Sequence, residues 1–422
     1  MADAPLPSPT RGLLRASLTL AAGGALAQAL PLLLGPLLTR LFTPAEFGHY
    51  HLFAAVAANL GVVACGRYEF ALPMAADDGE ADALRRIALR LLGATTALAA
   101  LGAGGWALAG AGAWVAWLPL AVAAAGAVSL ATLWATRAQR FRALAAARVL
   151  QYGGAAAAQV LAGLAGAGLT GLIVAPIAAA AVATAVLRLP WHGALPQAPA
   201  LAGVMRRHRD FPLLNTPHAF AGALQDTLSL VLIAALLGPA EAGFWGLALR
   251  YLKAPATLVG SAVSQALYPK LAAAGPTPEA RRAVRRVMGL LALLAAPLVL
   301  LLWVAGPWAF EAAFGPAWRE AGVLARALAL YVGLHFVASP LAVVTMAWQA
   351  QAWALKLALA GQLAFVAALA AGLALGDLAG AGWAVSAAMA GYFGVYFWCL
   401  ARWPMPTVGA DAALPAPSSA TR

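Results

Sequence analysis

The chain of 422 residues begins with an apolar run that strongly limits its possible folds. The segment from Leu13 to Leu38 carries no charge after Arg15. At ~1.5 Å per helical residue, such a run crosses a hydrocarbon layer ~30 Å thick. It is too long for the apolar part of a cleavable signal peptide and lacks a small-residue cleavage site with a mature domain behind it. We therefore expect it to remain as a membrane span.

Similar runs recur along the chain. Apolar residues make up 63% of the sequence and charged residues 10%, which is too apolar for one soluble core of this length. We therefore predict an all-α polytopic membrane protein with about 12 transmembrane helices. The expected spans are 13–38, 47–72, 91–109, 114–134, 149–164, 169–187, 213–237, 242–267, 287–304, 321–348, 357–375 and 380–400.

A repeated turn indicates two related halves. Thr43 suits the N-cap of the second span, with Pro44 at its first position and Glu46 where a capping-box carboxylate reaches back. Gly-Pro-Ala-Glu-Ala-Gly at 238–243 repeats Thr-Pro-Ala-Glu-Phe-Gly at 43–48 with an offset of 195 residues. Six spans in each half predict a parallel repeat, related by an axis along the membrane normal.

These features predict four segments. They are an N-terminal six-helix lobe at 1–190, a cytoplasmic linker loop at 191–212, a C-terminal six-helix lobe at 213–403 and a disordered cytoplasmic tail at 404–422. The formal net charge of +12 comes mainly from Lys and Arg residues in the loops that are expected on the cytoplasmic side. With both termini in the cytoplasm, nearly all loop Lys and Arg, Arg148 among them, fall inside, and only Arg40 and Arg319 fall outside. The charge thus indicates orientation, and we expect no nucleic-acid partner.

Three charged residues are expected near the midplane of the membrane. Asp226 lies 13 residues before Pro239, while Arg250 and Lys253 lie 11 and 14 residues after it, roughly 16 to 21 Å along a helix. They can meet. Pairing of Asp226 with one cation that only neutralises buried charge is one interpretation. The surplus positive charge instead favours a water-filled cavity or an anionic ligand.

Other polar residues in the spans leave two readings each. Arg67 and Glu69 are expected near the cytoplasmic mouth, where Arg67 either reaches the interface or lines the mouth. Gln28 and Asn59, at mid-depth, either line the cavity or form interhelical hydrogen bonds. Tyr331, His335 and Ser339 are spaced four residues apart and form a polar stripe on one helix face. His335 either relays protons or has a purely structural role.

Chemistry-bearing motifs are missing from the sequence. We find no metal-ligand spacing, no phosphate-cradling glycine loop and no nucleophile with a plausible base. We therefore expect no metal, no cofactor and no enzymatic activity. Asp226, Glu69 and His335 are candidates for binding a coupling proton or sodium ion.

Two stretches resemble a known family. The run from Leu18 to Gly48, followed by Gly-Arg-Tyr-Glu-Phe-Ala-Leu-Pro at 66–73, resembles the opening of Wzx-type flippases for lipopolysaccharide and polysaccharide biosynthesis. The segments 246–255 and 264–269 are similar to that family as well. It belongs to the multidrug, oligosaccharidyl-lipid and polysaccharide (MOP) exporter superfamily.

The resemblance implies a bacterial inner-membrane protein with two six-helix lobes around a cavity that opens to alternate sides. The implied substrate is an oligosaccharide on undecaprenyl pyrophosphate, used for O-antigen or exopolysaccharide synthesis. Membrane lipids, a polysaccharide polymerase and glycosyltransferases are the implied partners. Arg250, Lys253 and Arg67, with Gln28 and Asn59, are the expected substrate-binding residues. Because Ala55 and Ala58 occupy the positions equivalent to Arg250 and Lys253, we expect no mid-depth cation from the first half.

Two other functions are considered. A cation-coupled multidrug antiporter of the same fold is expected to have an acidic site, whereas buried cations outnumber buried acids here. A membrane polysaccharide polymerase or ligase is expected to have a substantial outer loop with Arg or His. The longest expected outer loop, at 305–320, is modest and carries Trp308 and Trp318 as expected interface anchors.

Overall fold

The computed structural model describes residues 9–190 and 199–403, apart from the side chains of residues 9–18, 20, 21 and 218. All regular structure in this part of the chain is helical. The first half forms α1 (Pro9–Leu41), α2 (Pro44–Gly61), η1 (Tyr68–Met74), α3 (Asp78–Leu108), η2 (Ala113–Trp117), α4 (Leu118–Arg137), α5 (Phe141–Arg148), η3 (Val149–Gly154), α6 (Ala155–Leu164) and α7 (Gly168–Leu187). The second half forms α8 (Leu201–Arg207), η4 (Phe211–Asn215), α9 (Thr216–Leu236), α10 (Pro239–Ala274), α11 (Pro278–Phe314), η5 (Pro316–Trp318), α12 (Arg319–Ala327), α13 (Ala329–Ala347), α14 (Gln351–Ala374) and α15 (Leu378–Ala401).

The helices confirm the predicted fold class. Nine helical segments of the described chain are long and apolar enough to cross a membrane. The other three expected spans fall in α2, in the run from α5 to α6 and in α10. Helix therefore covers all or most of every expected span, and the structure is consistent with twelve.

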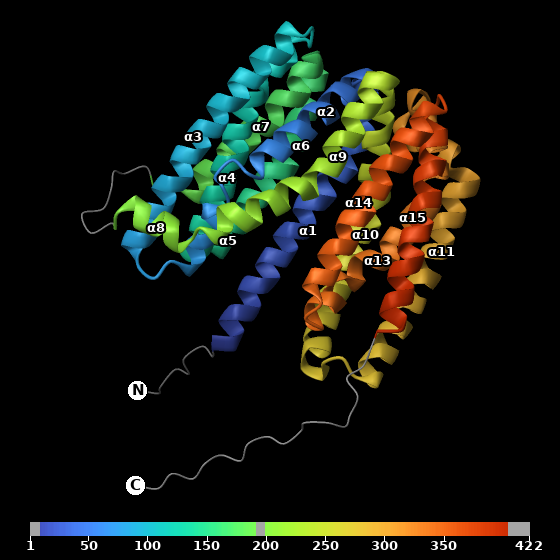
Figure 1. The fold of residues 1–422 in the computed structure, drawn as a ribbon. Helices are drawn as coiled ribbons and strands as arrows, with labels where there is room; N and C mark the ends of the chain where they lie inside the picture. Colours follow the sequence, from blue (N-terminus) through green and yellow to red (C-terminus); the bar gives the residue numbers. More distant parts are fainter. Residues whose placement is uncertain (1–8, 191–198, 404–422) are drawn as a thin grey trace, which may run out of the picture.

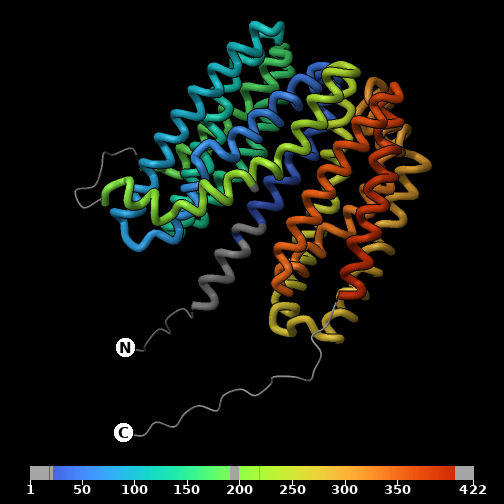
Figure 2. Tube along the Cα trace, viewed as in Figure 1, coloured from blue at the N-terminus to red at the C-terminus, as the bar shows by residue number. Residues whose placement is uncertain are grey.

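The helices form two bundles that converge at one end of the molecule and diverge toward the other (Figure 1). At the convergent end, here called the turn end, α1 turns into α2 and α9 turns into α10. The opposite end, where α1 begins and α15 ends, is here called the terminal end. Figure 2 shows α1 running between the bundle of the first half and that of the second.

Each bundle has its own apolar core. One cluster of buried side chains extends from Phe53 to Leu189 in the first half and also includes Val204 of α8. The other belongs mainly to the second half, but it also includes Leu38, Phe42 and Phe47 near the first turn. The two halves are thus joined chiefly at the turn end.

Several predicted boundaries are wrong. The second span is not one helix to residue 72, because α2 ends at Gly61 and a turn leads into η1. Gly66 and Arg67, in the turn between α2 and η1, have left-handed φ of 59° and 62°, so a right-handed helix cannot run through this turn. The expected span 321–348 is divided between α12 and α13. The longest expected outer loop is largely helical, because α11 continues to Phe314. The tail at 404–422 lies outside the described residues.

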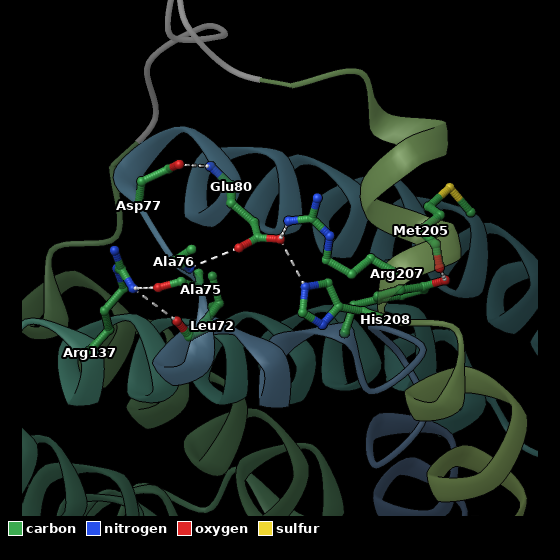
Figure 3. A network of polar contacts seen from close by, with 10 residues as sticks. Leu72, Ala75, Ala76, Asp77, Glu80, Arg137, Met205, Arg207 and His208 are labelled. Atoms are coloured by element: carbon green, nitrogen blue, oxygen red, sulfur yellow. Dashed lines mark hydrogen bonds and ion pairs between the residues drawn. The ribbon is translucent and has the colours of Figure 1, made fainter. Parts of the chain in front are cut away.

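The linker between the halves also differs from prediction. It is not loop throughout 191–212, because α8 occupies part of it and packs against α3. Figure 3 shows the polar contacts that hold this helix. The Glu80 carboxylate accepts hydrogen bonds from the Ala76 amide at 2.8 Å, from Arg207 at 2.9 Å and from Nε2 of His208 at 3.1 Å. The end of the linker is thereby fixed to the first half.

Candidate functional site

A cavity of about 500 Å³ lies between the two halves and is here called the central cavity. Its walls come from α1, from the junction of α5 and η3, and from α10. The lining residues are Gly24, Ala27, Gln28, Pro31, Leu32, Arg148, Tyr152, Arg250, Lys253, Ala254 and Thr257. Three of them are cations and none is acidic. The cavity therefore favours an anionic ligand.

Arg148 is the functional candidate that sequence reasoning missed. A fifth span beginning at Val149 places this residue on the cytoplasmic side. The helix begins instead at Phe141, so Arg148 ends α5 and leads directly into the π-helical η3. The first half therefore supplies a cation to the cavity from α5, which the comparison of Ala55 and Ala58 with Arg250 and Lys253 did not predict.

The cationic face of α10 is held against α1 by two side chains. Arg250 donates a hydrogen bond to the carbonyl of Pro31 at 3.3 Å, and the Tyr251 hydroxyl donates to the carbonyl of Leu32 at 2.7 Å. The Leu32 carbonyl is available because Pro36, four residues later, has no N–H to donate. Gly35 leaves room for the tyrosine, since a Cβ there would lie 1.5 Å from its hydroxyl oxygen. Both prolines of α1 thus help to shape the cavity wall.

A second cavity of about 430 Å³ lies within the second half. It is here called the second-half cavity and is lined by α9, α10, α13, α14 and α15. Tyr331, His335 and Ser339 all line it, so the predicted polar stripe faces one space. Lys253 lines both cavities, and its Nζ lies 3.9 Å from the Asp226 carboxylate, which also faces the second-half cavity. The predicted meeting of Asp226 with Lys253 is therefore present as a long ion pair.

The two expected mid-depth amides have different positions. Gln28 lines the central cavity. Asn59 is buried and lines neither described cavity; its Nδ2 donates to the Thr227 hydroxyl at 3.4 Å, joining α2 to α9. Of its two predicted readings, the interhelical hydrogen bond is the one observed.

Arg67 and Glu69 lie apart from both described cavities. The guanidinium of Arg67 stacks over the ring of Phe70, with its Cζ 4.2 Å from the ring centre. The Glu69 side chain is 2% exposed, and its Oε2 has no partner among the described residues. The depth estimated for Arg67 from helical rise does not apply, because the chain leaves the helix after Gly61.

The turn end is closed by the repeated turns themselves. A Cβ added to Gly48 would lie 1.6 Å from the Pro239 carbonyl, and one added to Gly243 would lie 2.0 Å from the Pro44 carbonyl. This reciprocal contact is the arrangement that a parallel repeat produces. Trp318 lies beside it and is fully buried, which corrects its assignment as an interface anchor. Its Nε1 donates to the Thr39 carbonyl at 3.0 Å.

These features define a class of protein: a helical, multi-pass membrane protein whose two bundles enclose a cationic cavity. Residues 88–323, more than half of the chain, match the profile of the family described as "Polysaccharide biosynthesis protein". The chain belongs to that family. A search of curated proteins finds no match.

Solved structures show the same fold. The lipid II flippase MurJ in an inward closed conformation aligns with a TM-score of 0.69 and 10% identity, over 90% of this chain and 87% of that one. A multidrug resistance MATE family transporter of the MOP superfamily, in an inward-facing conformation, aligns with a TM-score of 0.61 and 14% identity, over 88% and 93%. At these identities the likeness is one of fold.

Proposed function

We propose that this protein is a flippase that moves oligosaccharides linked to undecaprenyl pyrophosphate across the bacterial inner membrane. The glycans serve O-antigen or exopolysaccharide synthesis. Translocation proceeds by alternating access and involves no covalent chemistry. The observation that carries the proposal is the set of three cations, contributed by both halves, in one cavity without an acidic lining residue.

The physical argument concerns the head group of the substrate. A diphosphate carries concentrated negative charge and must cross ~30 Å of hydrocarbon. Charge-assisted hydrogen bonds from Arg and Lys replace the water that it loses. Arg148, Arg250 and Lys253 are the residues we assign to the diphosphate. Gln28 lies beside them and is assigned to the same ligand, while Arg67 and Asn59 lie outside the cavity and are not.

The orientation and ion coupling are parts of the same proposal. The Arg-rich terminal end faces the cytoplasm under the positive-inside rule, which makes the closed turn end periplasmic. Asp226 and His335 remain coupling candidates because both line the second-half cavity. Glu69 is supported by its buried, unpartnered carboxylate oxygen. The cationic lining argues against a multidrug cation antiporter.

The experiment is reconstitution into liposomes that contain undecaprenyl pyrophosphate carrying an oligosaccharide. Glycan that reaches the outer face is counted with a lectin that cannot cross the bilayer. We expect the lectin-accessible fraction to rise with the protein and to stay constant in empty liposomes. An equal fraction in both preparations would reject the proposed function.

A further inference from the structure

The second-half cavity has no role in holding the diphosphate, yet it adjoins the residues that do. Lys253 lines both cavities, so a ligand bound by that ammonium group in the central cavity has the second-half cavity directly beside it. The volume of about 430 Å³ lies in the range of small-molecule sites and far exceeds the ~30 Å³ that one water occupies. The space is therefore large enough for an organic group rather than an ion alone.

Aromatic rings form much of the cavity wall. The lining includes Tyr331, Phe365, Tyr392, Phe393 and Tyr396. Tyr331 contacts Phe365 with ring centres 5.5 Å apart, and Tyr392 contacts Phe393 at 5.1 Å. The faces of such rings carry partial negative charge, which attracts the weakly positive C–H groups on the flat side of a sugar ring.

Hydrogen-bonding groups are interspersed among the rings. Gln225, His335 and Gln362 line the cavity, and in the described part of the chain none of their side chains takes part in a hydrogen bond. Amide and imidazole groups can both donate and accept. Free groups of this kind, placed between aromatic faces, suit the hydroxyl groups of a carbohydrate.

Two other ligands fit less well. A divalent metal ion such as Ca²⁺ or Mg²⁺ needs several oxygen ligands, and the described residues contain no group of three His, Cys, Asp or Glu side chains that could hold one. Asp226 is already paired with Lys253 at 3.9 Å. A prenyl chain would leave Gln225, Gln362 and His335 facing hydrocarbon without hydrogen-bond partners, which is unfavourable for polar groups removed from water. A sugar satisfies both the rings and the polar groups.

We infer that the second-half cavity binds sugar rings of the lipid-linked glycan, next to the diphosphate held by Arg148, Arg250 and Lys253. This inference rests on the proposed function and adds a glycan subsite to it. Lys253 lies at the boundary between the two subsites. Tyr392, whose ring packs against Gly361, supplies a stacking face, and Gln362 supplies hydrogen bonds.

The test compares two lipids that differ only in sugar: undecaprenyl diphosphate, and the same lipid carrying one N-acetylglucosamine. Their dissociation constants are measured by equilibrium titration of the full chain in lipid nanodiscs. We expect the wild type to bind the glycosylated lipid about tenfold more tightly. Gln362→Leu and Tyr392→Leu should remove most of this preference without changing the affinity for the sugar-free lipid. Tyr392→Phe keeps the aromatic ring and should retain most of the preference for the glycosylated lipid.

Gln351→Leu is the matched control, because Gln351 lies on α14 like Gln362 but outside the cavity lining. This variant should behave as the wild type. Thermal unfolding verifies that each variant is folded. If Gln362→Leu and Tyr392→Leu both keep the wild-type preference for the glycosylated lipid, the inference is overturned. It is also overturned if these two variants lose affinity equally for both lipids, which would indicate a prenyl-chain site. Wild-type protein that binds both lipids equally refutes the sugar subsite alone. Wild-type protein that binds neither refutes the proposed function as well.

Discussion

At the residue scale, the central cavity depends on charges that come from distant parts of the sequence. Arg148 belongs to the first half, while Arg250 and Lys253 are three residues apart on α10. An Arg guanidinium can bind a phosphate through two parallel hydrogen bonds, whereas Lys acts as a point charge. A ligand held by all three connects the two bundles electrostatically.

The first prediction concerns Arg148. Replacing it with Ala removes the positive charge that the first half contributes to the cavity lining, and we expect the translocation rate to fall about tenfold or more. Arg148→Lys keeps the charge and should retain an intermediate rate. The translocation rates of both Arg148 variants are measured by lectin accessibility in proteoliposomes. Lys270→Ala removes a cation of α10 that is outside the cavity lining and should leave the rate unchanged. Wild-type rates for Arg148→Ala would show that this arginine does not bind substrate.

A second prediction concerns Asp226. If its carboxylate binds the coupling ion, Asp226→Asn should remove the dependence of translocation on a proton or sodium gradient. The rate is measured with each gradient imposed and then collapsed. Asp377→Asn, at the cap of α15, is the control carboxylate and should retain the wild-type dependence. An Asp226→Asn protein that responds to gradients as the wild type does would remove Asp226 from the coupling candidates.

The positions of single charged residues can be predicted from the sequence only where the helix boundaries are predicted correctly. The depth of Asp226, Arg250 and Lys253 was counted from a turn that lies where expected, so their proximity was predictable. Arg148 and Arg67 were misplaced because α5 begins eight residues early and α2 ends eleven residues before the predicted limit of 72. No local sequence signal marked the π-helical stretch that follows Arg148.

At the element scale, the contact of α2 with α10 holds the turn end closed. The two helices begin with the same Pro-Ala-Glu motif, and each presents a glycine to the proline carbonyl at the start of the other. The capping box at Thr43 and Glu46 is formed as predicted, with Glu46 accepting from the Thr43 amide at 2.8 Å. The close approach itself was not predictable, because it depends on how the halves pack.

The third prediction uses this contact. Gly48→Leu places a side chain where the Pro239 carbonyl lies, so we expect the turn end to open. Spin labels at Leu108→Cys and Leu375→Cys, both highly exposed, report the separation of the bundles in a background lacking Cys65 and Cys399. Their measured distance should lengthen. Gly289→Leu, where a Cβ meets nothing within 4 Å, should leave it unchanged. The same distance in both variants would contradict the closure role.

The fourth prediction concerns helix α8 and the contacts in Figure 3. Glu80→Ala removes the acceptor for Arg207 and His208, so we expect amide hydrogen exchange in 201–207 to accelerate about tenfold. The estimate is modest because the Arg207 side chain is 69% exposed. Glu279→Ala breaks a fully surface pair with Arg282 and serves as the control. Unchanged exchange in Glu80→Ala would show that α8 is held by other contacts.

At the scale of the whole molecule, the structure is closed at the turn end by contacts between the halves. Each half has its own apolar core. Under the alternating access that we propose, the two bundles would rock against each other as nearly rigid bodies, as expected for a parallel repeat. Composition and periodicity were enough to predict this class of fold. The shape of the cavities was not predictable, because it depends on which faces of α1, α5 and α10 meet.

The most direct test is translocation by the triple variant Arg148→Ala/Arg250→Ala/Lys253→Ala in liposomes containing the lipid-linked oligosaccharide. Size-exclusion chromatography and thermal unfolding establish that the variant is folded, and Lys270→Ala is the matched single-charge control. The proposed mechanism predicts that lectin-accessible glycan falls to the level of protein-free liposomes in the triple variant and stays at the wild-type level in the control. Wild-type translocation by the folded triple variant would contradict it.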